Sequence, residues 1–178
     1  MNTGQSLFSI GALLLLSLTV LRVNNTILSS DVVLRDSKLG ILSVSLATSL
    51  IEEANRKAFD MATAEDGITD VNLLTSPYSL GPGSGENPED FNDFDDYNKY
   101  VKLDTIFTII NVGNSTIIDT TRYVIFKDSC TVCYVEPDNI DGKIMEKTWH
   151  KKITVFVSSP SMIDTIKISK VFSYWNFR

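Results

Sequence analysis

Six carboxylates crowd one short stretch and form the densest group of potential metal ligands in the sequence. They are Glu86, Glu89, Asp90, Asp93, Asp95 and Asp96. Hard oxygen ligands on a flexible loop suit Ca²⁺, so the candidate calcium ligands are Asp90, Asp93, Asp95 and Asp96. The spacing is not that of an EF-hand, because the glycine and the final glutamate are missing from their places. The alternative is a solvated acidic loop that keeps the protein soluble. Apart from calcium, the sequence predicts no cofactor.

Aromatic residues interleave with these acids at a spacing of three: Phe91, Phe94, Tyr97 and Tyr100. This spacing predicts a helical turn whose aromatic edge docks on the rest of the protein or on a neighbour. The acids are then expected to face water.

The two cysteines of the chain, Cys130 and Cys133, form a C-x-x-C motif. A redox motif of this kind sits at a helix N-terminus, whereas the run TVCYVEP predicts a strand. A zinc site needs a second pair of ligands, and only His150 is spare. In an exported protein we expect the two thiols to form a short disulfide across a turn or bulge. Free buried thiols are the alternative.

The length and composition are sufficient for one globular core, with further residues outside it. The chain has 178 residues and a formal net charge of −6. Nucleic-acid binding is not expected, because neutralising phosphates needs clustered lysines and arginines, and none are clustered here. With one histidine and no nucleophile elbow, the sequence does not predict an enzyme.

An uncharged apolar run from Leu7 to Leu21 precedes the first basic residue, Arg22. A secretory signal would need basic residues before the run and a small-residue cleavage site after it, and both are missing. A membrane anchor needs about 20 apolar residues, so this run is short for that role. The third interpretation is a helix that packs against copies of itself. Its candidate assembly residues are Leu7, Phe8, Ile10, Leu13, Leu14, Leu15, Leu16, Leu18, Val20 and Leu21.

The apolar run is the first part of one long predicted helix over residues 5–62, of which 5–23 are the apolar part. No proline interrupts this stretch, and apolar residues continue at helical spacing after Arg22. At about 1.5 Å per residue such a helix is roughly 80 Å long. A domain of this size cannot bury all of it, so we expect half of the helix to protrude and to find a partner.

The remainder predicts a loop region and then a sheet. Glycines and prolines mark residues 63–100 as an acidic loop region. Residues 101–178 switch to period two and to β-branched residues, which predicts an antiparallel meander. The expected strands are 101–112, 115–126, 131–137, 151–159 and 164–175, with FKDSC as a turn. One face should pack on the helix between about Asp31 and Met61, and the other should be mostly polar. The fold class is therefore α+β.

The stretch Gly-Gln-Ser-Leu-Phe before an apolar helix resembles the processing site of type IV pilins and pseudopilins. The order of long helix, variable loop and C-terminal antiparallel sheet is similar to the architecture of that family. The segments DDYNKY and WHKKITVFVSSPS also resemble stretches of pilin-like proteins.

This resemblance implies a leader of residues 1–4, cut after Gly4, so that Gln5 becomes the new, methylated N-terminus. The family usually has glutamate at the fifth mature position, where this sequence has Ser9, and the leader lacks the usual basic residues.

The function implied is that of a structural subunit in an extracellular filament. Its partners would be identical subunits in a helical filament, after residence in the inner membrane. Its final location would be the cell surface. A minor pseudopilin of a secretion system is one alternative. Another is a membrane-anchored or secreted β-domain that binds a ligand without forming filaments.

Overall fold

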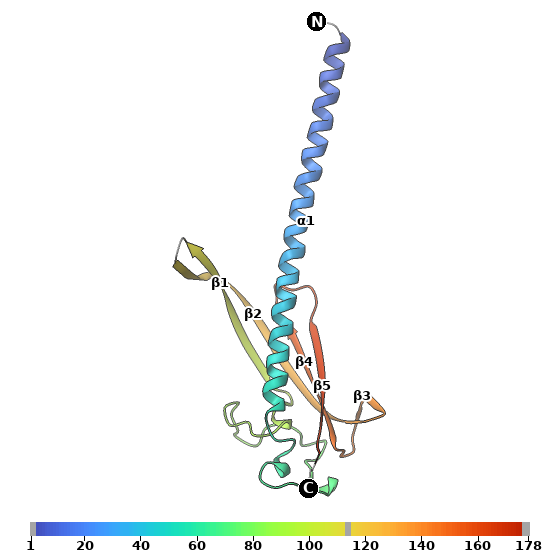
Figure 1. The fold of residues 1–178 in the computed structure, drawn as a ribbon, viewed down its shortest axis with the longest axis vertical. Helices are drawn as coiled ribbons and strands as arrows, with labels where there is room; N and C mark the ends of the chain where they lie inside the picture. Colours follow the sequence, from blue (N-terminus) through green and yellow to red (C-terminus); the bar gives the residue numbers. More distant parts are fainter. Residues whose placement is uncertain (1–2, 113–114, 176–178) are drawn as a thin grey trace. The chain divides into compact units, whose positions relative to one another are not determined.

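A computed structural model of the chain describes residues 3–112 and 115–175 (Figure 1). It contains one helix, α1 (Thr3–Asn55), and five strands: β1 (Val101–Val112), β2 (Ser115–Glu136), β3 (Asn139–Ile144), β4 (His150–Ser158) and β5 (Ile166–Ser173). Three short 3₁₀ turns lie between α1 and β1: η1 (Met61–Thr63), η2 (Val71–Leu73) and η3 (Asp95–Tyr97). The chain forms two compact units, residues 1–39 and 40–178, and α1 contributes to both. The predicted α+β class is confirmed.

Helix α1 ends at Asn55, seven residues before the predicted end at residue 62. The cause is a backbone pairing with the acidic region. Ala58 donates its N–H to the carbonyl of Asn92 (3.1 Å) and accepts from the N–H of Phe94 (2.8 Å). This parallel bridge requires extended backbone, so it draws the chain out of the helix.

The sheet is antiparallel throughout, with strand order β1-β2-β4-β5, and β3 pairs with the end of β2. The prediction of a turn at FKDSC is wrong, because β2 is one continuous strand of 22 residues. Asp128 lies inside that segment and pairs with Lys102 on one side and with Val157 on the other. Ladder bonds on both sides outweigh the weak strand preference of these residues.

The inward face of the sheet alternates along each strand. The side chains buried on this face are Phe126, Asp128, Cys130, Val132 and Tyr134 on β2 and Lys151, Ile153, Val155 and Val157 on β4. The C-terminal part of α1 packs against the sheet, as predicted, with Ser43, Ala47, Leu50, Ile51 and Ala54 buried. Helix and sheet thus form the two layers of the folded unit.

The outward face is less polar than expected on its β1–β2 half. Exposed apolar side chains gather there: Val101, Leu103, Phe107, Tyr123 and Ile125. Their cross-strand pairs are in register, since Phe107 faces Tyr123 and Thr105 faces Ile125. On the β4 side Lys152 and Thr154 are polar, as the prediction stated.

The predicted disulfide is wrong, because Cys130 and Cys133 are both free thiols. They lie on the same strand and three residues apart, so their side chains point to opposite faces. Three strand residues span about 10 Å between Cα atoms, whereas a disulfide needs less than about 7 Å. The expected turn that would have brought them together does not exist.

Candidate functional site

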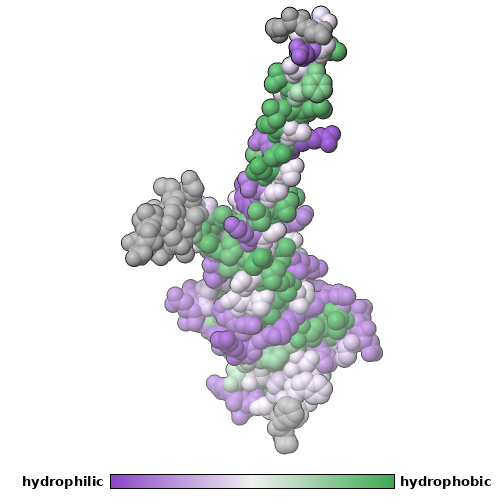
Figure 2. Space-filling model, turned by 45° about the horizontal axis from the view of Figure 1, so that its top comes forward, coloured by the Kyte–Doolittle hydropathy of each residue, from purple (hydrophilic) through white to green (hydrophobic). Residues whose placement is uncertain are grey.

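The apolar part of α1 is the first candidate site. All ten side chains predicted for assembly are between 57% and 80% exposed in the single chain. Figure 2 shows apolar side chains gathered along this helix on the face drawn. A helix that is apolar on all sides is normally buried in lipid or in a protein core. In the isolated chain this segment therefore lacks the apolar surroundings that its composition requires.

The hydroxyl groups of this segment need no partner outside the helix. Ser9 donates to the carbonyl of Gln5 (2.9 Å), Ser17 to that of Leu13 (2.9 Å) and Thr19 to that of Leu16 (2.7 Å). These are the hydroxyls between Leu7 and Leu21. Entering an apolar environment would thus leave none of these donors unsatisfied, which removes the main cost of burying them.

Helix α1 is long and apolar enough to cross a membrane, and a signal sequence near an N-terminus has the same properties. The uncharged run of fifteen residues, Leu7 to Leu21, spans about 22 Å at 1.5 Å per residue, compared with about 30 Å of hydrocarbon. The run is therefore too short to cross the hydrocarbon layer by itself, and a spanning helix would need residues beyond both ends of the run.

The predicted processing residues, Gly4 and Gln5, lie in the first turns of α1 and are exposed. Apart from its chain neighbours and the nearby helix backbone, no described atom lies within 4 Å of the position that a Cβ on Gly4 would occupy. At the position where the family usually has glutamate, the hydroxyl of Ser9 is bound to its own helix, and the site carries no charge.

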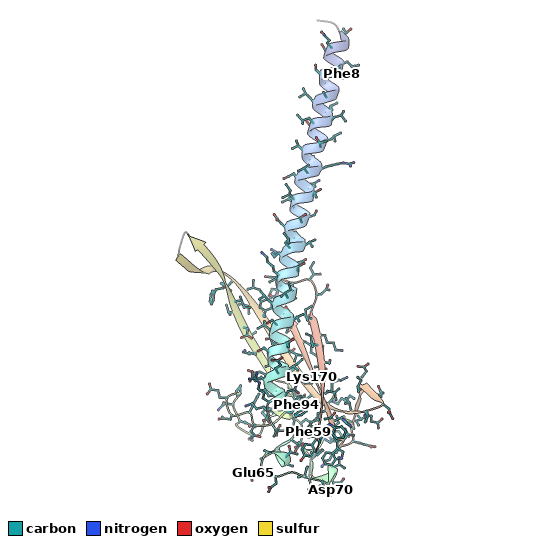
Figure 3. All side chains as sticks on the ribbon, in the orientation of Figure 1. Phe8, Phe59, Glu65, Asp70, Phe94 and Lys170 are labelled. Atoms are coloured by element: carbon teal, nitrogen blue, oxygen red, sulfur yellow. The ribbon has the colours of Figure 1, made fainter. Side chains whose placement is uncertain are left out.

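A second candidate site is a buried charged cluster around Lys151, the first inward-facing residue of β4. Its side chain is fully buried, and its Nζ binds the carbonyl of Phe59 (2.9 Å) and Asp60 Oδ2 (2.8 Å). The closest contact of Nζ is with Asp95 Oδ1. The ring centroids of Phe59 and Tyr134 lie 4.7 Å and 5.3 Å from Nζ. In Figure 3, Phe59 and Phe94 mark this part of the unit.

Half of the six carboxylates in the acidic run are buried rather than solvated. Asp93, Asp95 and Asp96 are buried, so the expectation that these acids face water is wrong, while Asp90 is exposed. Asp93 Oδ1 accepts the N–H groups of Asp95 and Asp96, and Asp96 Oδ2 accepts those of Asn92 and Asp93. The acids here fold their own loop. The aromatic docking is confirmed, since Phe91, Phe94 and Tyr97 are buried.

Calcium binding by Asp90, Asp93, Asp95 and Asp96 stays a prediction. Within residues 3–112 and 115–175, no group of three or more potential ligands is arranged to hold a metal ion. The carboxylates that the prediction counted on are instead used by backbone N–H groups and by Lys151.

The three acids around Lys151, which are Asp60, Asp93 and Asp95, differ in the direction of their pKa shifts. Burial alone would raise the pKa of Asp60, but Lys151 and hydrogen bonds from Thr75 and Ala62 hold it below its ordinary value. Burial, followed by the neighbouring Asp95 and Asp96, raises the pKa of Asp93 to about 8. Burial also raises the pKa of Asp95, despite the opposing effect of Lys151. At neutral pH, Asp60 is therefore ionised and Asp93 carries a proton.

The sequence carries a local signal for the burial of Lys151. Lys151 is in phase with Ile153, Val155 and Val157, so the alternation itself places a lysine on the buried face. Asp60 also fits a local pattern, because its side chain caps η1 in a capping box with Thr63. No local pattern identifies the pairing between them, which spans 91 positions.

His150, which was considered as a spare metal ligand, instead pairs across strands. Its Nδ1 lies 2.7 Å from Ser173 Oγ. It also lines a hollow of about 320 Å³ with Ile68, Thr69, Trp149, Tyr174 and Trp175. Trp149 and Tyr174 stack there with ring centroids 5.4 Å apart.

No protein-family model matches this chain, and neither the curated proteins nor the solved structures contain a match.

Proposed function

We propose that this chain is a structural subunit of an extracellular filament of the type IV pilus kind, assembled through residues 5–23. The observation that carries the proposal is the apolar segment of α1, exposed on all sides and with its hydroxyls satisfied internally. Such a segment can enter an apolar environment without leaving its hydroxyl groups unsatisfied. The folded unit of residues 40–178 would form the outer coat of the filament.

Packing of identical helices would supply the free energy of assembly. Full burial of a large aliphatic side chain contributes about 1.5–3 kcal/mol, against which the lost freedom of each subunit must be set. Small residues would allow the helices to approach closely: Ser9, Gly11, Ala12 and Ser17. Head-to-tail contacts that do not close into a ring let the assembly grow as a fibre.

In this proposal the helix first rests in the inner membrane. Cleavage after Gly4 leaves Gln5 as a methylated N-terminus, and the helix then moves from lipid into the filament core. The short apolar run supports a temporary stay, because an anchor about 22 Å long holds less firmly than one that matches the bilayer. A minor pseudopilin of a secretion system would use the same segment in the same way.

The alternative function is that of a membrane-anchored or secreted binding domain. The apolar patch on the outward face of β1 and β2 favours it, since exposed apolar patches mark interaction surfaces. In that case the helix is only an anchor and no filament forms.

Two measurements on the native organism test the proposal. Electron microscopy of sheared cell-surface material should show filaments, and their protein should give peptides of this chain. Mass spectrometry of the intact protein should find Gln5 at the N-terminus. A monomeric, detergent-dependent protein that still begins at Met1 would contradict filament assembly and would favour the anchored binding domain.

A further inference from the structure

The cluster around Lys151 places a primary amine against a carboxyl group inside a closed, aromatic environment. The side chains of Lys151 and Asp60 are fully buried, and that of Asp95 is 3% exposed. The rings of Phe59 and Tyr134 flank Nζ, and Phe94 beside Asp95 in the chain is also buried. An ion pair in such a place is costly, because neither partner keeps its hydration.

We propose that Lys151 and Asp95 join in an intramolecular isopeptide bond, between Nζ and Cγ, which the folded chain forms by itself. The bond is independent of filament assembly, so a result against one does not contradict the other.

Asp95, rather than Asp60, is the carboxyl that geometry assigns to the bond. Asp60 is ionised, and its oxygens accept from Thr75 N (2.9 Å), Thr75 Oγ1 (3.0 Å) and Ala62 N (3.1 Å) as well as from Lys151. A carboxylate held in this way is a poor electrophile. Asp95 instead makes the closest contact with Nζ, and its carboxyl shares a hydrogen bond with the carboxyl of Asp93.

The reaction balances without any other reagent. The Lys151 ammonium gives one proton to Asp95, whose pKa burial raises, and the free Nζ lone pair attacks Cγ of the neutral Asp95 carboxyl. The new C–N bond forms and one C–O bond of Asp95 breaks. Asp93 donates its proton to the departing oxygen. The departing oxygen thus leaves as water, with one proton that came from nitrogen through Asp95 and one from Asp93. The second proton that nitrogen loses returns Asp93 to its starting form. The products are one neutral amide and one water, and nothing is oxidised or reduced.

The surroundings favour this product for two physical reasons. The reacting atoms are already held together, so the entropic cost of bringing an amine to a carboxyl has been met by folding. The amide is neutral, whereas the pair that it replaces consists of two desolvated charges. The buried site also excludes the water that would reverse the reaction.

The bond would link η3 to the beginning of β4, across 56 positions of sequence. It would tie the loop region before β1 to the centre of the sheet. Such a link persists when the chain is denatured, which makes it directly measurable.

The test is the intact mass of the full wild-type chain, purified folded and then denatured. We expect it to be lighter than the sequence by one water molecule. Proteolysis and fragmentation should show the peptide with Asp95 still attached to the peptide with Lys151. A wild-type chain of full mass would overturn the proposal, and this result does not depend on whether any variant folds.

Variants locate the water loss. Lys151→Arg and Asp95→Ala should both restore the full mass, whereas the matched control Lys152→Arg should keep the loss. A loss that persists in Lys151→Arg would place it elsewhere, for example in a succinimide at Asp141-Gly142, and would overturn the proposal.

Asp93→Asn tests the proton donor while keeping the shape of the side chain. We expect this variant to fold, as judged by circular dichroism, and to accumulate the linked form at least tenfold more slowly than the wild type when both are folded from newly synthesised, still unlinked chains. Linkage at the wild-type rate in the folded variant would overturn the role given to Asp93.

Discussion

Asp104 and Asp128 show how single residues set the pH response of this protein. They lie on the inward face of β1 and β2, and Lys102 pairs with Asp104 at 3.2 Å. Within the described part of the chain, Asp104 Oδ2 and Asp128 Oδ1 are buried without a hydrogen-bond partner. Burial, followed by the proximity of Asp104, raises the pKa of Asp128 to about 6. The folded state therefore holds a proton that the unfolded chain would release at lower pH.

Asp128→Asn should make the protein more stable than the wild type at neutral pH. The pKa of Asp128 rises from 3.8 to about 6 on folding, so its stabilising contribution is complete below pH 3.8 and is lost as the pH rises through 6. At neutral pH the wild type is then destabilised by on the order of 1–3 kcal/mol, which the amide avoids. Urea denaturation of both proteins at several pH values measures this difference. Curves that keep the same separation between about pH 4 and pH 7 would contradict the assignment.

The two cysteines should differ in reactivity. Cys130 is buried, and burial raises the pKa of its thiol to about 12, while Cys133 is half-buried. We expect iodoacetamide to label Cys133 slowly in the native protein and Cys130 only after denaturation. Mass spectrometry of the labelled peptides measures this order. A mass that shows a disulfide between the two would contradict the strand geometry.

At the scale of elements, the contact between α1 and the sheet depends on small side chains. Ser43, Ala47 and Ala54 lie at its fully buried positions, on either side of the larger Leu50 and Ile51 in the sequence. Small residues let the helix backbone approach the sheet closely. The large apolar residues indicated that this part of the helix packs on the sheet but did not identify these points of closest approach, because alanine and serine give little hydrophobic signal.

Ala47→Leu should therefore destabilise the folded unit by about 1–3 kcal/mol through overpacking. Ala47 is fully buried, whereas Ser45 on the same helix is exposed. The matched control Ser45→Leu should change the free energy of unfolding by less than about 0.5 kcal/mol. Thermal or urea denaturation gives both values. Equal effects of the two leucines would show that the helix does not pack on the face described.

At the scale of the whole molecule, one helix serves two environments. Its residues in the unit 40–178 have a buried side and an exposed side, whereas the residues 7–21 are exposed and apolar all round. The part within the unit 40–178 buries its apolar side inside the chain, whereas residues 7–21 require lipid or other chains to cover their apolar side chains. An assembly defect should therefore be separable from a folding defect.

Leu14→Glu should abolish filament formation and leave the fold of residues 40–178 unchanged. Leu14 is 61% exposed, so no intramolecular packing is lost, while a carboxylate in an apolar helix bundle is strongly unfavourable. The matched control Ser29→Glu adds the same charge to an exposed position outside the apolar run and should assemble normally. Filament yield by electron microscopy and the thermal midpoint of the folded unit are measured together. Normal filaments from Leu14→Glu would refute assembly through this segment.

The sequence by itself determined the features that depend on local pattern. The long helix, its apolar beginning and the α+β class follow from periodicity and composition, as do the strands β1, β4 and β5. These features need only neighbouring residues for their definition. The same local information failed at FKDSC, where turn-forming residues were kept in β2 by ladder bonds to strands on both sides.

Only the tertiary structure decided which charged groups meet. Lys151 lies 91 positions from Asp60 and 56 from Asp95, and their meeting requires the helix end, the acidic loop and the sheet to be in place. The same packing buried three of the four predicted calcium ligands, Asp93, Asp95 and Asp96, and placed the two cysteines on opposite faces of one strand. Long-range pairing is set by the total burial and hydrogen bonding of the unit, which no single stretch of sequence encodes.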